Sequence, residues 1–122
     1  MSVQRATGDG FEIAAERHLQ TAGLIVLARN VTCRHGELDL VMQDQEVVVF
    51  VEVRYRRSAG FGGALASVDA HKQRRLIATA AFYLQTHPTQ ARRPCRFDVI
   101  AIAGEIENPR IEWIKDAFRV DG

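Results

Sequence analysis

The sequence has little that would favour secretion, insertion into a membrane or stabilisation by disulfides. It contains only two cysteines, Cys33 and Cys95, far apart in the chain, and without a secretion signal a disulfide between them is not expected. No apolar run approaches the ~20 residues of a transmembrane helix, and the N-terminal segment lacks the continuous apolar stretch of a signal peptide. We therefore expect a cytoplasmic protein with no membrane partner.

A strong excess of charge of either sign is also absent. With 16 lysines and arginines against 15 aspartates and glutamates, the net charge is +1, so the chain lacks the overall basic character typical of nucleic-acid-binding proteins. The basic residues are nevertheless grouped, which favours an anionic partner such as DNA over the alternative of separate solvated charges. Our candidates for contacting nucleic acid are Arg56, Arg57, Arg74 and Arg75.

The composition is that of one folded domain, expected to span residues 1–122. Hydrophobic residues make up 47% of the chain and charged residues 25%, which is ordinary for a globular protein of this length. Apolar residues at helical spacing predict helices over residues 11–22 and 68–85, and alternating or β-branched segments predict strands over residues 24–31, 37–42, 47–55, 95–103 and 110–115. This order, α-β-β-β-α-β-β, predicts an α/β fold with a mixed central sheet of about five strands flanked by helices.

Polar residues and glycines indicate where these elements begin and end. Asp9 is the expected N-cap of the first helix and Gly23 its terminator, and Asp69 or Ser67 is expected to cap the second helix. Residues 43–46 are expected to form the loop of a hairpin between the second and third strands. The glycine-rich residues 58–63 are expected to form a mobile loop.

Two of the predicted strands carry carboxylates that alternation places on one side of the sheet. Side chains alternate along a strand with a period of two, so Glu37 and Asp39 share a face, as do Glu52 and Arg54. If residues 43–46 close a simple hairpin, Glu37 lies opposite Glu52, and cross-strand partners point to the same side. We therefore expect these four side chains to converge.

Carboxylates grouped beside apolar residues need a positive partner, because like charges repel and burial penalises each ionised form. A divalent cation would supply that charge, and ligation by a few oxygens suits Mg²⁺ or Mn²⁺. The alternative is that Glu37 and Glu52 form surface ion pairs with nearby arginines. The position of Glu52 inside the apolar segment VVVFVEV favours the metal.

The predicted helices add further candidates for this site. Glu12 lies at the border of the apolar stripe of the first helix and is a candidate metal ligand; the alternative is a first-turn carboxylate stabilised by the helix dipole. In the second helix Gln73 falls within the apolar stripe and Lys72 at its border. They are candidates to position a phosphate or a metal-bound water, with a solvated first turn as the alternative. Arg74 and Arg75 fall on the outer face.

These motifs resemble those of known nuclease-like proteins. Glu37-Leu38-Asp39-Leu40 followed by Val51-Glu52-Val53-Arg54 resembles the (P)D…(D/E)xK motif of restriction-endonuclease-like nucleases, and the first helix and hairpin are similar to those of archaeal Holliday junction resolvases. Nearly the whole chain resembles the YraN-like bacterial family. The shared pattern consists of Gly8-Asp9-Gly10-Phe11-Glu12, Asn30, residues 36–40, residues 50–54, Lys72-Gln73 and Arg96-Phe97-Asp98-Val99.

The resemblance implies a restriction-endonuclease-like fold and a Mg²⁺-dependent endonuclease acting on DNA, including structured or branched DNA. Branch-cutting relatives act as dimers, so a homodimer is expected by analogy. The resemblance assigns Asp39 and Glu52 as metal ligands, with Glu12 as an accessory acidic residue. Glu37 stands near the place of the motif's proline and is a site-supporting residue.

Arg54 departs from the nuclease motif, which has lysine at this position. Arginine in practice cannot release a proton, so Arg54 can stabilise a phosphate but cannot act as a general base. Cleavage then depends on the metal alone or on Lys72, with Gln73 as a further catalytic candidate. Otherwise the protein is a nucleic-acid-binding module on a degenerate nuclease fold, or a structural protein with ion-paired carboxylates.

Overall fold

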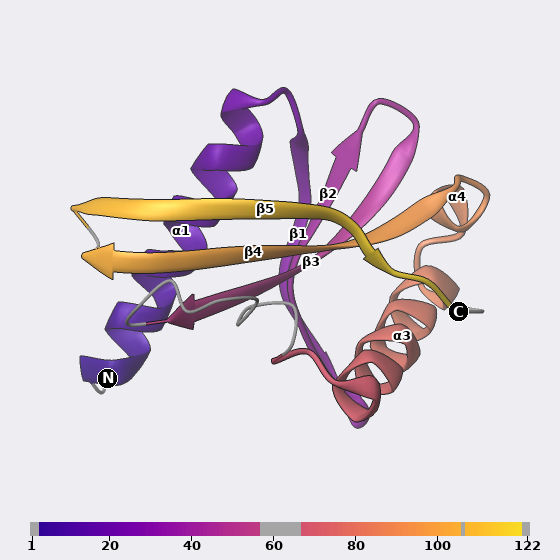
Figure 1. Cartoon of the computed structure of the whole chain (residues 1–122). Helices are drawn as coiled ribbons and strands as arrows, with labels where there is room; N and C mark the ends of the chain where they lie inside the picture. Colours follow the sequence, from indigo (N-terminus) through magenta and orange to yellow (C-terminus); the bar gives the residue numbers. More distant parts are fainter. Residues whose placement is uncertain (1–2, 57–66, 106, 121–122) are drawn as a thin grey trace.

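Five strands form a mixed sheet, with helices on both of its sides (Figure 1). The computed structural model describes residues 3–56, 67–105 and 107–120. The elements are α1 (Val3–Thr21), β1 (Ile25–Cys33), β2 (Gly36–Asp44), β3 (Val47–Arg56), α3 (Ala70–Gln85), α4 (Pro88–Ala91), β4 (Cys95–Glu105) and β5 (Asn108–Phe118). This confirms the predicted α/β class and the order α-β-β-β-α-β-β, to which the short helix α4 is an addition.

The strands lie in the sheet in the order in which they occur in the chain, so β3 is the central strand. Neighbouring strands are antiparallel except β3 and β4, which run parallel. A parallel pair needs a long crossover, and the chain between β3 and β4 contains α3. Strand β3 is buried from Val48 to Glu52, which explains why this strand is apolar at successive positions instead of alternate ones.

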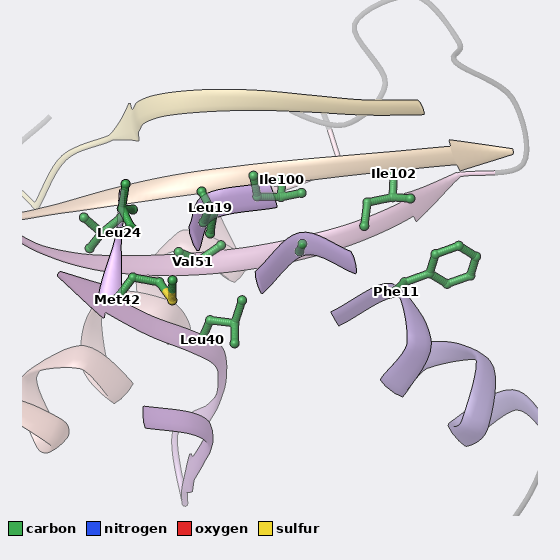
Figure 2. Close-up of a cluster of buried hydrophobic side chains, with 10 residues drawn as sticks. Phe11, Leu19, Leu24, Leu40, Met42, Val51, Ile100 and Ile102 are labelled. Carbon is green, nitrogen blue, oxygen red and sulfur yellow. The ribbon is translucent and has the colours of Figure 1, made fainter. Parts of the chain in front are cut away.

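One half of the core lies between α1 and the sheet (Figure 2). Phe11, Ala15 and Leu19 follow one another at helical spacing and form the apolar face of α1. They pack with Leu24 and with inward-facing residues of β2, β3 and β4, namely Leu40, Met42, Val49, Val51, Ile100 and Ile102. This packing fixes α1 against the sheet and thereby positions Glu12, which follows Phe11 directly.

The other half of the core lies between α3 and the opposite face of the sheet. From β3, Val48 and Phe50 point to this face, whereas Val49 and Val51 point to α1, as strand alternation requires. The cluster consists of Leu38, Val41, Val48, Phe50, Val68, Leu76, Ala80, Tyr83, Phe97 and Val99. Glu52, two residues beyond Phe50, therefore lies on the α3 side.

The β2–β3 hairpin is tighter than predicted. Residues 43 and 44 belong to β2, so that Met42 pairs with Val49 instead of residue 47. The predicted loop of residues 43–46 is therefore wrong, and the pairing is displaced by two residues, which means that Glu37 is not the partner of Glu52. Because side chains alternate with a period of two, this displacement leaves the carboxylates on the predicted face.

The helix ends agree with the sequence at two positions and differ at a third. Gly23 follows α1 with a φ of 99°, and the Asp69 side chain caps α3 by accepting a hydrogen bond from the Lys72 N–H at 2.9 Å. Asp9 is not an N-cap, because α1 begins at Val3 and continues through it. The glycines on either side of Asp9 suggest a boundary, but local propensity is a weak constraint on helix ends.

Two further findings concern the described part of the chain. Cys33 and Cys95 are both free. Of the helices that the structure describes, none combines the length and the apolar character needed to cross a membrane.

Removing the cap of α3 is expected to destabilise the protein modestly. Asp69→Ala removes the hydrogen bond to the Lys72 N–H, and loss of an N-cap lowers the free energy of unfolding by about 1 kcal/mol. Urea denaturation followed by circular dichroism measures the change. Asp69→Asn, which retains a capping oxygen, is the control, and an equal loss in both variants would contradict the role of the cap.

Candidate metal centre

Residues of β1, β2, β3 and α3 line a pocket of about 560 Å³. Its charged residues are Glu37, Asp39, Glu52, Arg54, Lys72 and Arg75. The four hairpin residues that alternation places on one face therefore do converge, and α3 adds two cations to them. Among the described residues, three carboxylates and three cations line this pocket, so their formal charges balance.

Asp39 joins the two strands where their backbone pairing ends. The last pair in the register is Leu40 with Val51, and beyond it Asp39 Oδ2 accepts a hydrogen bond from the Val53 N–H at 2.8 Å. Burial, followed by repulsion from Glu52, raises the pKa of Asp39 to about 8, against the opposing effect of the Val53 N–H. The Asp39 carboxyl group therefore retains a proton near neutral pH.

Glu52 is the most buried carboxylate of the pocket, with 5% of the residue exposed. Its Oε2 lies 3.1 Å from Lys72 Nζ and 3.2 Å from Arg54 Nη1. A buried carboxylate is costly unless it is paired, and these two cations provide the pairing. The ion pair between Glu52 and Arg54 corresponds in part to the alternative of carboxylates paired with arginines, but it joins two residues of the same strand and lies in the pocket instead of at the surface.

The guanidinium group of Arg54 is held in place by contacts with Glu52 and with Ser67. Besides its contact with Glu52, its Nε donates to the Ser67 hydroxyl at 3.1 Å, and its Nη2 donates to the Ser67 carbonyl at 3.4 Å. Ser67 precedes α3, so the arginine connects β3 to the segment that leads into the helix. This fixes a positive charge beside Glu52 at the position where the nuclease motif has lysine.

Asn30 links the first helix to the carboxylates. In the amide orientation that satisfies its neighbours, the Asn30 nitrogen donates to Glu12 Oε1 at 2.8 Å and to Glu37 Oε1 at 3.3 Å. Asn30 has a φ of 52°, a left-handed conformation that asparagine tolerates better than most residues. Glu12 contributes to the raised pKa of Asp39, but it is not among the residues that line the pocket.

The remaining sequence candidates lie in different places. Gln73 Nε2 donates to the Val68 carbonyl at 3.0 Å, so its amide is used at the start of α3 and does not line the pocket. Arg74 is exposed and also lies outside the lining. Arg57 and the expected loop of residues 58–63 fall outside the described residues, as does the side chain of Arg56.

Arg75 does not lie on the outer face of α3 as expected. Its guanidinium reaches the pocket, where Nε donates to the His35 carbonyl at 3.0 Å. The expectation failed because a helical wheel places the Cα atom, whereas the long arginine side chain folds back toward the turn between β1 and β2.

The carboxylates of the pocket fit a cation that needs few protein ligands. Within residues 3–56, 67–105 and 107–120, no three His, Cys, Asp or Glu side chains are grouped closely enough to hold a metal by themselves. Asp39 and Glu52 offer two carboxylates, and Mg²⁺ commonly uses one or two carboxylates together with water and substrate phosphate. Burial and repulsion from Glu52 keep a proton on Asp39, and a cation bound between the two carboxylates would displace this proton.

The contacts of two residues of the site, Asn30 and Ser67, were not predicted from the sequence. In the sequence, Asn30 is only part of a shared pattern, and Ser67 is only a possible helix cap. A left-handed asparagine inside a strand is a usable signal in principle, but φ is not visible in a sequence. The contact of Ser67 with Arg54 depends on the tertiary structure alone.

The fold and the pocket together define an α/β protein with a mixed five-stranded sheet and a carboxylate pair, of which Glu52 is buried and Asp39 half-buried, beside two cations. The chain belongs to the Uncharacterised protein family UPF0102, whose model matches residues 11–102. It is 51% identical over 118 residues to a UPF0102 protein of Stutzerimonas stutzeri (strain A1501). The match covers 97% of this chain and 98% of that relative.

Relatives from other bacteria are similar over nearly their whole length. A UPF0102 protein of Xanthomonas campestris pv. campestris (strain B100) is 50% identical, with 98% of this chain and 97% of the relative covered. One from Xylella fastidiosa (strain 9a5c) is 52% identical, with 97% and 96% covered. These matches confirm the YraN-like family assignment, and the matched region contains the pocket from Glu37 to Arg75.

Proposed function

We propose that this protein is a Mg²⁺- or Mn²⁺-dependent endonuclease-like protein that binds DNA, including structured or branched DNA, and hydrolyses its phosphodiester bonds. The observation that carries the proposal is the Asp39–Glu52 pair in a pocket that it shares with Lys72 and Arg54. Two carboxylates that can hold a cation, with positive charge beside them for a phosphate, are groups that can promote phosphodiester hydrolysis.

The chain's own residues have distinct parts in this proposal. A bound Mg²⁺ or Mn²⁺ would activate water and neutralise charge on the phosphodiester. Asp39 and Glu52 would hold the cation, while Arg54 and Lys72 would stabilise the negative charge that develops on the phosphate. Arg54 cannot accept a proton, which leaves Lys72 as the pocket's basic side chain able to exchange one.

A non-catalytic nucleic-acid-binding module is the second candidate function. The identity of Arg54 favours it, because the nuclease motif has lysine at this position. The two candidates share the pocket and the anionic partner, and they differ in whether a DNA strand is cut.

Metal binding and DNA cleavage by wild type, Asp39→Asn and Glu52→Gln separate these functions. Isothermal titration with Mn²⁺ is expected to show binding to the wild type and binding at least about tenfold weaker to both variants, since each loses a charged ligand. Cleavage is assayed on duplex, single-stranded and branched DNA. Glu46→Gln, at an exposed residue in the β2–β3 turn, is the matched control and should behave as wild type.

Each outcome favours a different function. Metal binding with metal-dependent cleavage supports the nuclease. Metal and DNA binding without cleavage supports the binding module. A wild-type protein that binds neither Mg²⁺ nor Mn²⁺ would overturn the proposed metal centre, and its carboxylates would then be structural ion-pair partners.

A further inference from the structure

Arg75 differs from the other two cations of the pocket in having no carboxylate partner. Lys72 and Arg54 both contact Glu52 Oε2, so each of them is engaged in an ion pair. Within the described ranges, no aspartate or glutamate lies at ion-pairing distance from Arg75. The pocket therefore contains one guanidinium whose positive charge is available to an anion.

The guanidinium of Arg75 is held in a defined place. Its Nε donates to the His35 carbonyl at 3.0 Å, and a Cβ atom added to Gly36 would lie 3.6 Å from Arg75 Nε and 3.7 Å from Nη2. The side chain thus lies against the turn between β1 and β2. Because the bond to His35 uses Nε, the Nη groups keep hydrogen atoms for a ligand, and an oriented guanidinium binds phosphate in a bidentate manner.

Arg75 and the Asp39–Glu52 pair lie at different points along the pocket. Lys72 and Arg75 are three residues apart on α3 and therefore on the same side of the helix, with a rise of about 4.5 Å between them. Lys72 contacts Glu52, whereas Arg75 lies at Gly36, the first residue of β2. Gly36 is about 10 Å along the strand from Asp39, so one phosphate at the carboxylates would leave Arg75 without a ligand.

We propose that Arg75 binds a backbone phosphate other than the one placed at Asp39 and Glu52, so that the pocket takes a strand with at least two successive phosphates. This rests on the proposed function and deepens it, because it assigns a nucleic-acid polymer, in preference to a nucleotide or a phosphomonoester, as the ligand of the pocket. Contacts of this kind fix the register of a strand without reading its sequence.

Fluorescence anisotropy with a labelled oligonucleotide in EDTA tests the role of Arg75 without any contribution from a metal. Arg75→Gln retains an amide donor for the His35 carbonyl but removes the charge. It is expected to bind about tenfold more weakly than wild type, with the slope of log Kd against log salt reduced by about 1. Arg17→Gln, which removes an exposed arginine from α1, is the charge-matched control and should change affinity by less than about twofold.

The outcomes distinguish this proposal from the metal centre. If Arg75→Gln weakens oligonucleotide binding no more than Arg17→Gln does, the assignment of Arg75 is overturned, whether or not the protein binds metal. If the wild type binds no oligonucleotide, the assignment is likewise overturned, and Mn²⁺ titration shows separately whether the metal centre survives. Arg75→Gln should bind Mn²⁺ as wild type does, and thermal unfolding of each variant reports any loosening of the β1–β2 turn.

Discussion

In the absence of divalent cations, the protein is expected to lose stability as the pH rises from about 4 to about 8. Burial and the neighbouring Glu52 raise the pKa of Asp39 from 3.8 to about 8. Between these values the folded protein keeps a proton on Asp39 that the unfolded chain has released. Where the folded state binds more protons than the unfolded state, the free energy of unfolding falls with rising pH.

Asp39→Asn is expected to remove this contribution. The asparagine oxygen can accept the hydrogen bond from the Val53 N–H, and its amide can donate to Glu52, so the variant resembles wild type with Asp39 protonated. The two proteins should therefore be similarly stable near pH 4, where the folded and unfolded wild type begin to differ in the protonation of residue 39. Near pH 8.5 the variant should be the more stable by several kcal/mol, since each pKa unit corresponds to about 1.4 kcal/mol.

The difference between wild type and variant in urea denaturation is the quantity to measure, because it cancels the titration of groups that the two proteins share. Glu46→Gln, at an exposed residue, is the control and should follow wild type at every pH. A saturating divalent cation should restore stability to wild type at pH 8 and do little for Asp39→Asn. A difference that stays constant from pH 5 to pH 8.5 would contradict the raised pKa of Asp39.

Much of the fold could be predicted because the relevant patterns are local. The apolar stripes of α1 and α3 and the β-branched segment of β3 indicate the type of each element, and element order then restricts the architecture. The ends of the helices and strands could be predicted less well. Asp9 has the chemistry of an N-cap, but the helix continues through it, and Asp44 looks like a loop residue, but it pairs with Val47.

The candidate site could be predicted in part for a related reason. The convergence of Asp39 and Glu52 depends only on strand parity, which a displacement of two residues does not change. By contrast, the contacts of Asn30 with Glu12 and of Arg75 with the His35 carbonyl join segments far apart in the chain. No periodicity encodes such contacts, because they depend on how α1 and α3 pack against the two faces of the sheet.

Replacing Lys72 with methionine is expected to lower DNA cleavage by about 100-fold or more, which is the usual effect of removing a group that stabilises charge in a transition state. Lys72 Nζ lies 3.1 Å from Glu52 Oε2, so its charge is within the carboxylate site itself. Methionine keeps an unbranched apolar chain of similar length and removes only the ammonium group. Mn²⁺ binding should be unchanged or tighter, because a cation that competes for Glu52 is gone.

Lys72→Arg and Arg54→Lys show how the positive charge acts. Lys72→Arg keeps the charge but cannot release a proton, so an activity close to wild type would indicate electrostatic stabilisation, and an activity as low as that of Lys72→Met would indicate proton transfer. Arg54→Lys introduces into β3 the lysine that the nuclease motif has at this position, and it tests the same function at the strand residue. Cleavage by Lys72→Met at the wild-type rate would contradict a role for this residue.

A comparison of Lys72→Met with Arg54→Met then locates the function of the motif lysine. The two cations contact the same oxygen of Glu52 at nearly equal distances, 3.1 Å and 3.2 Å, so a purely electrostatic role predicts similar losses. They differ in origin, one from α3 and the other from β3, and only one of them can exchange a proton. A much larger loss at Lys72 would mean that the helix supplies here what the strand supplies in the nuclease motif, so that the arginine in β3 is compatible with catalysis.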